Sequence, residues 1–311
     1  MCCGGRQTVV RCILIRWIAR HVNAFPLTHL LCFHKPDKCA RQPCGQRVLN
    51  MRQSIAIAIG LVMMAQPSLA HVTDLHPETA GFYDDFSEGL DKDRWYVSDG
   101  WTNGDWQDCE WSGRAVKAQS GMLSLFHTPA PLDEKRPPLC GEVQTKAFFQ
   151  YGTFEARIRT PKQSGLNASI FTYTGPVHGT PHDEIDIEIL TRDPDVMTMN
   201  TYVAGAPLNG GKVPANPSFD DAFHTVGFRW DPEGITWYMD GQEVHRTEPD
   251  ATLPSHPQKL FMSFWSTATL TDWMGRQTAQ DGPLEYQIDW IAYTPLDASC
   301  LFEGSVTCEP N

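Results

Sequence analysis

Short segments rich in β-branched and aromatic residues recur from Gly81 to Leu296, and this region shows no sustained helical period. Clusters of Gly, Pro, Asn and Asp separate the segments. Many short strands with frequent turn signals are typical of a sandwich or barrel, so the pattern predicts an all-β protein. The segments that we expect to be strands cover residues 121–126, 152–159, 168–173, 184–190, 196–203, 225–230, 235–239, 259–265 and 284–293.

Turn residues mark several of the connections between these strands. Asp240-Gly241 lies between residues 235–239 and 242–245 and predicts a hairpin, because Gly tolerates a positive φ. Five prolines fall between the expected strands, where no ladder hydrogen bond is lost: Pro161, Pro176, Pro194, Pro232 and Pro254. There is no internal repeat or low-complexity linker, so we expect one domain, 71–296, followed by a short tail, 297–311.

The first 70 residues differ from the rest of the chain. Residues 51–70 combine a basic start, an apolar run from Ile55 to Ala65 and a small-residue end at Ala70, which predicts a secretory signal peptide. The apolar run is shorter than the ~20 residues that span a bilayer. We interpret residues 1–50 as an upstream extension outside the mature protein; the alternative is a basic cytoplasmic segment before an uncleaved anchor. We therefore expect a secreted or periplasmic protein.

The chain after Ala70 is strongly acidic. It contains 16 Lys and Arg against 36 Asp and Glu, a formal charge of 16 − 36 = −20. Such a surface excludes nucleic acid and anionic membrane as favoured partners. It suits an exported protein that acts on a neutral ligand, and we expect a monomer.

Four of the ten cysteines follow residue 70: Cys109, Cys140, Cys300 and Cys308. An even number in an exported chain predicts two disulfides, and four cysteines permit three pairings. We expect Cys109–Cys140 and Cys300–Cys308. Neither pair has the CxxC spacing of a zinc site.

The segment Asp183–Leu190, DEIDIEIL, is the most informative of the expected strands. Successive side chains of a strand point to opposite faces, so Glu184, Asp186 and Glu188 share one face and three isoleucines share the other. The isoleucines should face the core. Three acids on one face repel each other and are poor strand formers, so folding alone gives little reason for them.

Glycoside hydrolysis gives such a reason. It needs one ionised carboxylate to attack the sugar and a second, protonated one to release the leaving oxygen, and crowding raises the proton affinity of at least one acid. Glu184 and Glu188 lie ~13 Å apart along a flat strand, whereas a retaining mechanism needs about 5–5.5 Å between carboxyl groups. Curvature and the long side chains have to close that gap. The alternative is a solvated acidic strand face without chemistry.

Aromatic residues accompany the acid strand, and sugar rings stack their apolar C–H faces on aromatic rings. Those in or beside the strands around the acids are Trp101, Trp106, Trp111, Phe171, Tyr173, Tyr202, Trp265 and Trp273. For any one of them, packing in the core is the alternative. We assign Trp95, Trp230, Trp237 and Trp290 to the core.

The stretch 171–188, FTYTGPVHGTPHDEIDIE, closely resembles the catalytic strand of glycoside hydrolase family 16. The likeness runs from about Phe82 to Tyr293. It is closest to the lichenase (endo-1,3-1,4-β-glucanase) branch and to bacterial exopolysaccharide glycanases of the succinoglycan type. Further matching segments are 104–111, 151–155, 223–225, 237–241 and 272–275.

The resemblance implies a jelly-roll β-sandwich of two curved antiparallel sheets with a concave substrate cleft. By motif position, Glu184 matches the nucleophile, Asp186 the assisting acid and Glu188 the general acid/base. The positions that match substrate-binding residues are Trp101, Asn103, Glu142, Phe171, Tyr173, Asn200, Tyr202, Trp265 and Trp273. Cys109 and Cys140 match a disulfide near the cleft mouth. Asp289, with the backbone at Gly121, matches a structural calcium site, and no cofactor is expected for catalysis.

The resemblance predicts a secreted retaining endo-β-glycanase that cuts mixed-linkage (1,3-1,4) β-glucan. Lichenases have Arg, Asn and Trp where this chain has Gln144, Ser263 and His182, positions that border the cleft in the family. The substrate therefore stays open between β-glucan and a bacterial exopolysaccharide such as succinoglycan. The alternative from a different class is a non-catalytic carbohydrate-binding sandwich, since the fold alone does not decide activity.

Overall fold

The computed structural model describes residues 75–130, 137–298 and 300–308. The predicted upstream extension, signal peptide and cleavage site lie outside these residues. Within the described part of the chain, no helix is long and apolar enough to cross a membrane.

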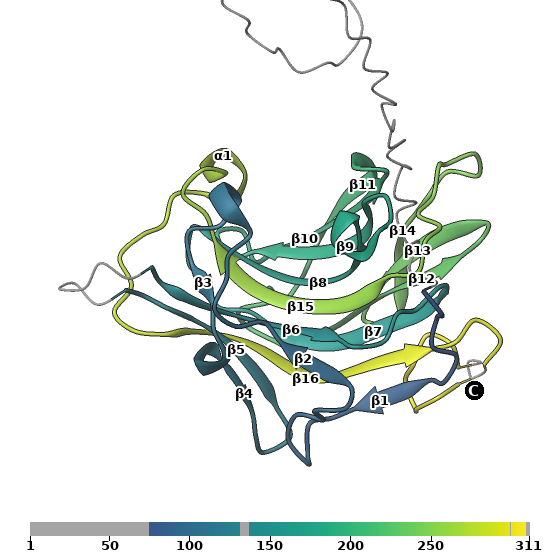
Figure 1. Cartoon of the computed structure of the whole chain (residues 1–311), viewed down its shortest axis with the longest axis horizontal. Helices are drawn as coiled ribbons and strands as arrows, with labels where there is room; N and C mark the ends of the chain where they lie inside the picture. The colour runs from purple at the N-terminus through teal and green to yellow at the C-terminus, as the bar shows by residue number, and fades with distance from the viewer. Residues whose placement is uncertain (1–74, 131–136, 299, 309–311) are drawn as a thin grey trace, which may run out of the picture. The chain divides into compact units, whose positions relative to one another are not determined.

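The described residues are almost entirely β-structure (Figure 1). The strands are β1 (Phe82–Asp84), β2 (Trp95–Val97), β3 (Glu110–Trp111), β4 (Val116–Ala118), β5 (Leu123–Thr128), β6 (Leu139–Thr145), β7 (Gly152–Arg159), β8 (Leu166–Thr174), β9 (Asp183–Leu190), β10 (Val196–Val203), β11 (Ala206–Pro214), β12 (His224–Asp231), β13 (Gly234–Met239), β14 (Gln242–Arg246), β15 (Lys259–Ser266) and β16 (Leu284–Thr294). The short helices are η1 (Gly104–Trp106), η2 (Gly113–Ala115), η3 (Pro176–His178) and α1 (Thr271–Met274).

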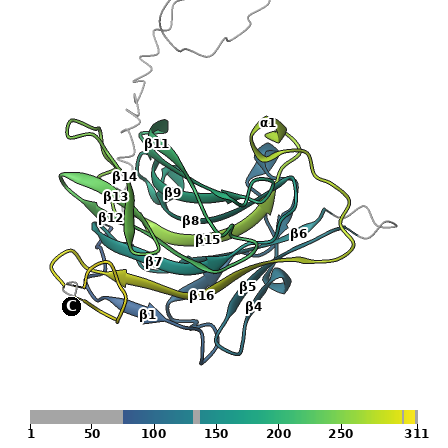
Figure 2. The ribbon, with the colours of Figure 1, turned by 180° about the vertical axis from the view of Figure 1, so that it is seen from behind.

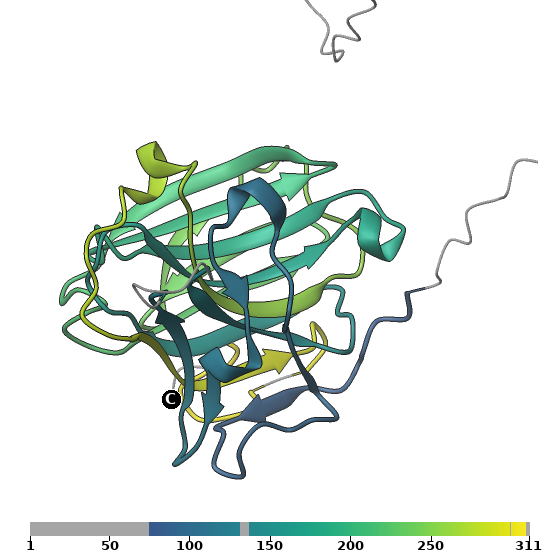
Figure 3. The ribbon, with the colours of Figure 1, turned by 60° about the vertical axis from the view of Figure 1, so that its left-hand side comes forward.

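Two curved antiparallel sheets lie on each other, as Figures 1 and 2 show from opposite sides. One sheet has the order β11-β10-β9-β8-β15-β6 and the other β5-β16-β7-β12-β13-β14. The outer face of the first sheet is concave, and the strands run across it side by side (Figure 3). The predicted all-β jelly-roll sandwich is therefore confirmed, and the acid strand β9 lies within the concave sheet.

Strand β6 belongs to both sheets. Its residues Gly141 to Gln144 pair with β15 in the concave sheet, while Leu139 and Cys140 pair with β5 in the other. A glycine is required at Gly141, because a Cβ there would lie 2.4 Å from the carbonyl oxygen of Ala115. The crossing strand thus joins the two layers at their edge.

The core between the sheets is formed by the apolar side of each strand. Ile185, Ile187 and Ile189 of β9 are fully buried, as their alternation with the acids predicts. Removing such side chains from water is the main stabilising contribution, at roughly 1.5–3 kcal/mol each. Trp237 of β13 also spans the layers, since its indole N–H donates to the backbone oxygen of Asp186 at 3.1 Å. The backbone beneath the acids is thereby held from the opposite sheet.

The strand predictions agree with the structure to within about two residues where the periodicity is strong, and β7 and β10 match at both ends. The Asp240-Gly241 turn is confirmed, with φ of 50° and 77°. The short strands β1 to β4 and the longer strands β6 and β11 were not predicted. Strand β11 contains Pro207 and Gly211, which are turn residues in the sequence but pair with β10 in the fold.

The tryptophan assignments hold for Trp95, Trp230 and Trp237, which are buried. The assignment of Trp290 to the core was wrong. Trp290 is only half-buried, on the outer face of β16, where its ring lies against Tyr83 at 5.6 Å and Phe302 at 4.9 Å between centroids. The bulge between Ile288 and Trp290 interrupts the alternation on which a sequence argument depends.

Both predicted disulfides are present, Cys109–Cys140 and Cys300–Cys308. The second closes the C-terminal tail, which docks on the outer face of the second sheet. There Ser305 Oγ donates to Glu155 Oε2 at 2.5 Å and the Val306 N–H donates to Oε1 at 3.0 Å. The tail therefore covers a buried carboxylate.

Candidate active site

The three acids of β9 lie in the middle of the concave sheet, each between a residue of β10 and one of β8. Glu184 lies between Tyr202 and Tyr173, Asp186 between Asn200 and Phe171, and Glu188 between Thr198 and Ser169. Directly paired residues share a face of an antiparallel sheet, so these nine side chains form three parallel rows on the concave face. Seven of them were predicted from the sequence to be site residues.

Glu184 is contacted by His182, which lies in the loop before β9. Nε2 of His182 lies 2.5 Å from Glu184 Oε2, and the imidazole stacks on Tyr202 with ring centroids 4.9 Å apart and planes at 13°. Burial, and then the charges of Asp186, Glu184 and Glu188, raise the pKa of Tyr202 to about 12, so its hydroxyl stays a proton donor.

Asp186, the middle acid, is only 4% exposed. Burial raises its pKa well above the usual value, and the negative charges of Glu184 and Glu188 and a hydrogen bond with Glu184 raise it further. The raised pKa favours the protonated form of Asp186, and in that form its hydroxyl can donate the hydrogen bond to Glu184.

Glu188 accepts a hydrogen bond from Asn167 Nδ2 at 2.7 Å. Burial is the largest influence and raises its pKa to about 7; Asn167 lowers it and the charge of Glu184 raises it. A carboxyl group with this pKa still carries its proton near neutral pH. The strand thus presents two glutamates on one face, and Glu188 is the one that can carry a proton near neutral pH; glycoside hydrolysis requires such a proton donor beside a second carboxyl group.

Glu142 continues the row of Glu188 across the sheet, through the paired residues Ser169 and Ser263. It is nearly fully buried and accepts a hydrogen bond from Ser98 Oγ at 2.6 Å. Burial raises its pKa to about 8, against the opposing effect of Ser98. At neutral pH it is a hydroxyl donor as well as an acceptor.

Aromatic side chains border the acids on two sides. Phe171 stacks on Phe261 at 4.9 Å between centroids, and Trp265 lies 6.2 Å from Trp273 of α1. Trp265 also packs on the buried cluster of Cys109, Cys140 and Trp111. Trp111 is thus a core residue rather than a sugar platform.

At the same end, Trp101 packs edge-on against Trp111 and keeps 39% of its surface exposed. Asn103 caps the next turn, η1, and is exposed. The predicted residues Trp101, Trp265 and Trp273 therefore lie at one end of the concave face, and the Cys109–Cys140 disulfide supports that end.

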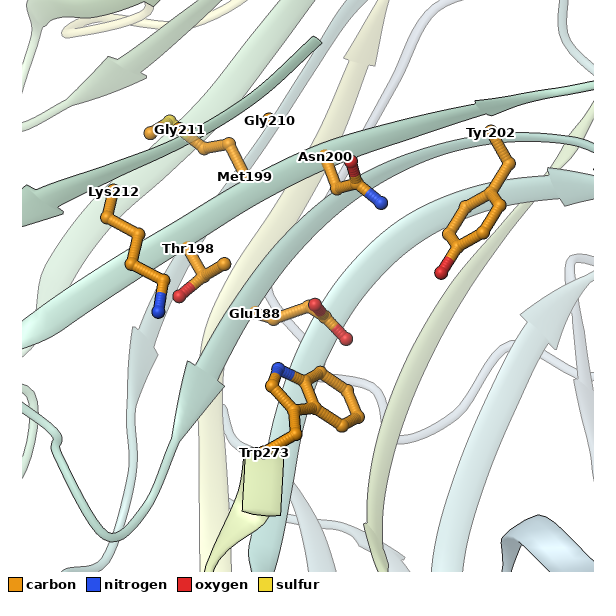
Figure 4. Close-up of a pocket in the computed structure, with 9 residues that line it drawn as sticks. All are labelled: Glu188, Thr198, Met199, Asn200, Tyr202, Gly210, Gly211, Lys212 and Trp273. Carbon is orange, nitrogen blue, oxygen red and sulfur yellow. The ribbon is translucent and has the colours of Figure 1, made fainter. Parts of the chain in front are cut away.

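A pocket of about 440 Å³ opens beside Glu188 (Figure 4). Its walls come from the consecutive strands β9, β10 and β11 and from α1, which lies about 60 residues further along the chain. The residues that line it are Glu188, Thr198, Met199, Asn200, Tyr202, Gly210, Gly211, Lys212 and Trp273. The predicted residues Asn200, Tyr202 and Trp273 meet here.

The predicted calcium residues lie apart from the acids, Asp289 in β16 and Gly121 before β5, both in the second sheet. The carboxylate of Asp289 accepts from Arg157 Nη1 at 2.5 Å and is thereby neutralised. Among the described residues no group of three or more His, Cys, Asp or Glu side chains is arranged to hold a metal ion. The carboxylate of Asp289 and the backbone oxygen of Gly121 are fewer than the six to eight oxygens that a calcium ion takes. The calcium ion stays a prediction.

Several residues of the site were not predicted: Ser98, Asn167, Thr198 and Lys212. Asn167 had a signal, because it directly precedes the expected strand 168–173 and alternates with Phe171 and Tyr173, so that it shares their face in β8. The sequence held no signal for Ser98 or Lys212, because only the fold brings Ser98 to Glu142 and pairs Lys212 with Thr198.

Comparison with known proteins agrees with this site. The family model "Glycosyl hydrolases family 16" matches residues 103–292. The "Endo-1,3-1,4-beta-glycanase ExoK" of Rhizobium meliloti is 40% identical over 228 residues, which cover 73% of this chain and 84% of the relative. A "Beta-glucanase" of Bacillus subtilis is 35% identical over 218 residues, 70% of this chain and 88% of the relative.

Solved structures give the same result. A lichenase from a mouse hindgut metagenome superimposes with a TM-score of 0.65 at 34% identity, over 70% of this chain and 99% of the other. The Bacillus licheniformis β-glucanase does so with a TM-score of 0.65 at 32% identity, over 69% and 97%.

Proposed function

The chain belongs to glycoside hydrolase family 16, and on that premise we propose that it is a retaining endo-β-glycanase that cuts internal bonds of mixed-linkage (1,3-1,4) β-glucan. The relatives named for this activity match more than two thirds of the chain. An open concave face suits a polymer that has to be bound along its length. The retaining stereochemistry and the substrate are our proposals.

The observation that carries the proposal is that Glu184 and Glu188 share one face of β9 and that Glu188 has a pKa raised to about 7. In the first step Glu184 attacks the anomeric carbon, while Glu188 gives its proton to the glycosidic oxygen that leaves. A glycosyl ester of Glu184 results. In the second step Glu188 takes a proton from a water molecule that attacks the same carbon, which releases Glu184 and restores the proton on Glu188.

Asp186 and His182 act through Glu184. The neutral acid and the imidazole both hydrogen-bond to this carboxylate, so its negative charge is stabilised before attack. As the ester forms, the charge on Glu184 disappears and the proton of Asp186 is held less by its neighbour. The two groups therefore tune the nucleophile rather than react themselves.

The second candidate substrate is a bacterial exopolysaccharide such as succinoglycan. The cleft positions Gln144 and Ser263 favour it, because each side chain is hydrogen-bonded to a neighbouring serine of the protein. Ser263 Oγ lies 2.7 Å from Ser169 Oγ, and Gln144 Nε2 donates to Ser98 at 3.4 Å. Fewer donors then face the sugar, and a site with fewer donors discriminates less between sugars. A non-catalytic binding role is disfavoured, because binding does not require crowded acids.

We also propose that residues 71–296 are the catalytic domain of a secreted or periplasmic monomer released by cleavage after Ala70. The acidic composition and the apolar segment of residues 55–65 support export. Amino-terminal sequencing of the exported protein should start at His71. A mature protein that begins near Met1 would contradict the signal peptide.

The experiment that tests the function is a parallel assay on barley β-glucan, lichenan, laminarin, cellulose and succinoglycan. Release of reducing ends should be fastest from one of the two mixed-linkage glucans, with a rapid fall in viscosity that marks internal cleavage. Proton NMR of the first products should show the β-anomer before mutarotation. Initial α-anomer would contradict retention, and preference for laminarin or cellulose would contradict the substrate.

A further inference from the structure

Lys212 stands in the pocket beside the general acid. It lies on β11 opposite Thr198 of β10, and Thr198 lies opposite Glu188 of β9. The three side chains therefore form one row on the concave face. Figure 4 shows the lysine side chain running along this row, with Trp273 across the pocket.

The charge of Lys212 contrasts with its surroundings. Among the described residues that line the pocket, Lys212 is the cation and Glu188 the acid. In the described part of the chain, the side chain of Lys212 has no ion pair or hydrogen bond, and the residue is exposed. The chain after Ala70 has a formal charge of 16 − 36 = −20. An unpaired ammonium group in the pocket of such an acidic protein therefore stands out.

Two other cations near the concave sheet, Arg192 and Lys259, have partners. Arg192 Nε donates to Asp193 at 2.8 Å and its Nη1 to the Asp272 carbonyl at 3.3 Å. Lys259 donates to Gln144 at 3.4 Å and lies over the Phe148 ring. These groups serve the fold. The ammonium of Lys212 is free for a ligand.

Lys212 is also not required for the chemistry of Glu188. Burial, Asn167 and Glu184 set the proton affinity of that carboxyl group. Two strand spacings, about 10 Å, separate the backbones of Lys212 and Glu188, with Thr198 between them. A group bound by Lys212 would therefore belong to a sugar next to the cleavage point.

We propose that Lys212 forms a subsite for a carboxylate carried by the glycan, on a sugar adjacent to the bond that is cut. This inference rests on the proposed function and specifies its substrate class as an acid-bearing β-glucan. The carboxylate can be that of a uronic acid or of an acyl half-ester, since the lysine is a point charge that recognises either.

The test compares barley β-glucan in four forms with matched degrees of substitution: unmodified, acetylated, oxidised at C6 to glucuronate, and succinylated. The acetylated form controls for bulk without charge. Wild-type protein, Lys212→Ala and Lys212→Glu are assayed for kcat/KM on each form. Lys117→Glu, an exposed lysine on β4 in the other sheet, is the matched control.

The measured quantity is the ratio of kcat/KM on a carboxylated form to that on the acetylated form. We expect the ratio to fall about threefold in Lys212→Ala and about tenfold in Lys212→Glu, through KM, as for an exposed ion pair. Raising the salt concentration should lower the wild-type ratio towards that of Lys212→Ala, because salt screens the pair. Lys117→Glu should keep the wild-type ratio.

A ratio that is the same in wild type and Lys212→Glu, with hydrolysis of unmodified glucan intact, would overturn the subsite alone. Wild-type protein that cuts none of the four forms would overturn the proposed function and this inference with it. A ratio that falls only for the glucuronate form assigns the subsite to a uronic acid. A fall only for the succinylated form assigns it to an acyl half-ester.

Discussion

The outer faces of the two sheets both bury carboxylates, but in opposite ways. On the second sheet, Glu155 is 1% exposed and receives hydrogen bonds from Ser305 and Val306 of the docked tail. On the concave sheet, Asp186 is about as buried, and its close neighbours include two further acids. One carboxylate is satisfied by neutral donors, whereas the other is crowded by charge of its own sign.

The difference shows what distinguishes structural from reactive burial. Burial raises the pKa of Glu155, while the hydrogen bonds from Ser305 and Val306 lower it and fix the tail to the sheet. Burial is also the main cause that raises the pKa values of Asp186 and Glu188, but there neighbouring acids raise them further, so that Glu188 can keep a transferable proton near neutral pH. The concave site therefore gains reactivity at the expense of stability.

Asp183 makes the same point within a single strand. It begins β9, and burial would raise its pKa, but hydrogen bonds from Ser255, His256 and Ala204 outweigh burial and lower it. Three residues later, Asp186 has a raised pKa. Position in the sequence does not separate these aspartates; their donors do.

The largest expected effect follows from removing Glu184, the proposed nucleophile, from the group of three acids. Glu184→Ala should lower kcat on β-glucan at least about a thousandfold, since no covalent intermediate can form. Added azide should restore turnover and give a glycosyl azide of inverted configuration, detected by NMR. If the variant kept more than a few per cent of the wild-type activity, Glu184 would not be the nucleophile.

Removing the protonated member should have a more selective effect. Glu188→Ala should lower kcat on β-glucan about a hundredfold to a thousandfold but retain turnover of aryl glycosides, whose leaving groups need no proton. Wild-type kcat/KM should fall as pH rises through about 7, where Glu188 loses its proton. An unchanged alkaline limb in Glu188→Ala would show that another group is the acid.

The satisfied carboxylate should affect stability instead. Ser305→Ala removes one donor to the buried Glu155, and we expect a loss of about 1–2 kcal/mol in the free energy of unfolding. Activity on β-glucan should remain, because the tail docks on the opposite face. Urea unfolding and the glucan assay measure the two quantities, and loss of activity in the folded variant would contradict the separation.

Glu142 allows a test of how burying an acid in the concave sheet makes the folding stability depend on pH. Its pKa is about 8 in the fold against about 4.3 in an unfolded chain. The stability that its proton contributes is complete below the unfolded value and is lost as pH rises towards 8. Glu142→Gln cannot lose a proton, so its melting temperature relative to wild type should increase from pH 5 to pH 8. A constant difference would contradict burial of the charge.

The smallest expected effect concerns specificity. Gln144→Arg with Ser263→Asn restores a long cation and a longer amide to the cleft floor. The ratio of kcat/KM on lichenan to that on succinoglycan should rise about twofold to fivefold. Each single variant serves as a control for the other. An unmoved ratio would mean that these positions do not set the choice of substrate.

The sequence was sufficient wherever one residue type alternated strictly with another. In β9, the isoleucines and acids set both the buried face and the catalytic face, and the resemblance supplied their roles. It was insufficient where the pairing partner decides. Lys212 lies in a strand whose glycines and prolines indicate turns, and only pairing with Thr198 brings it to Glu188. Trp290 was misassigned because a bulge shifts the alternation beside it.

Strand β6 has a consequence for how the molecule opens. Its backbone hydrogen bonds extend into both layers, and Cys140 ties it covalently to the loop that carries Cys109. Neither sheet can separate from the other without breaking the backbone hydrogen bonds of β6. Its amide hydrogens should therefore exchange with deuterium only through global unfolding, and a protease should find no stable half-open form to cut. The cleft can vary at its edge strand β11 while the frame beneath it opens as one unit.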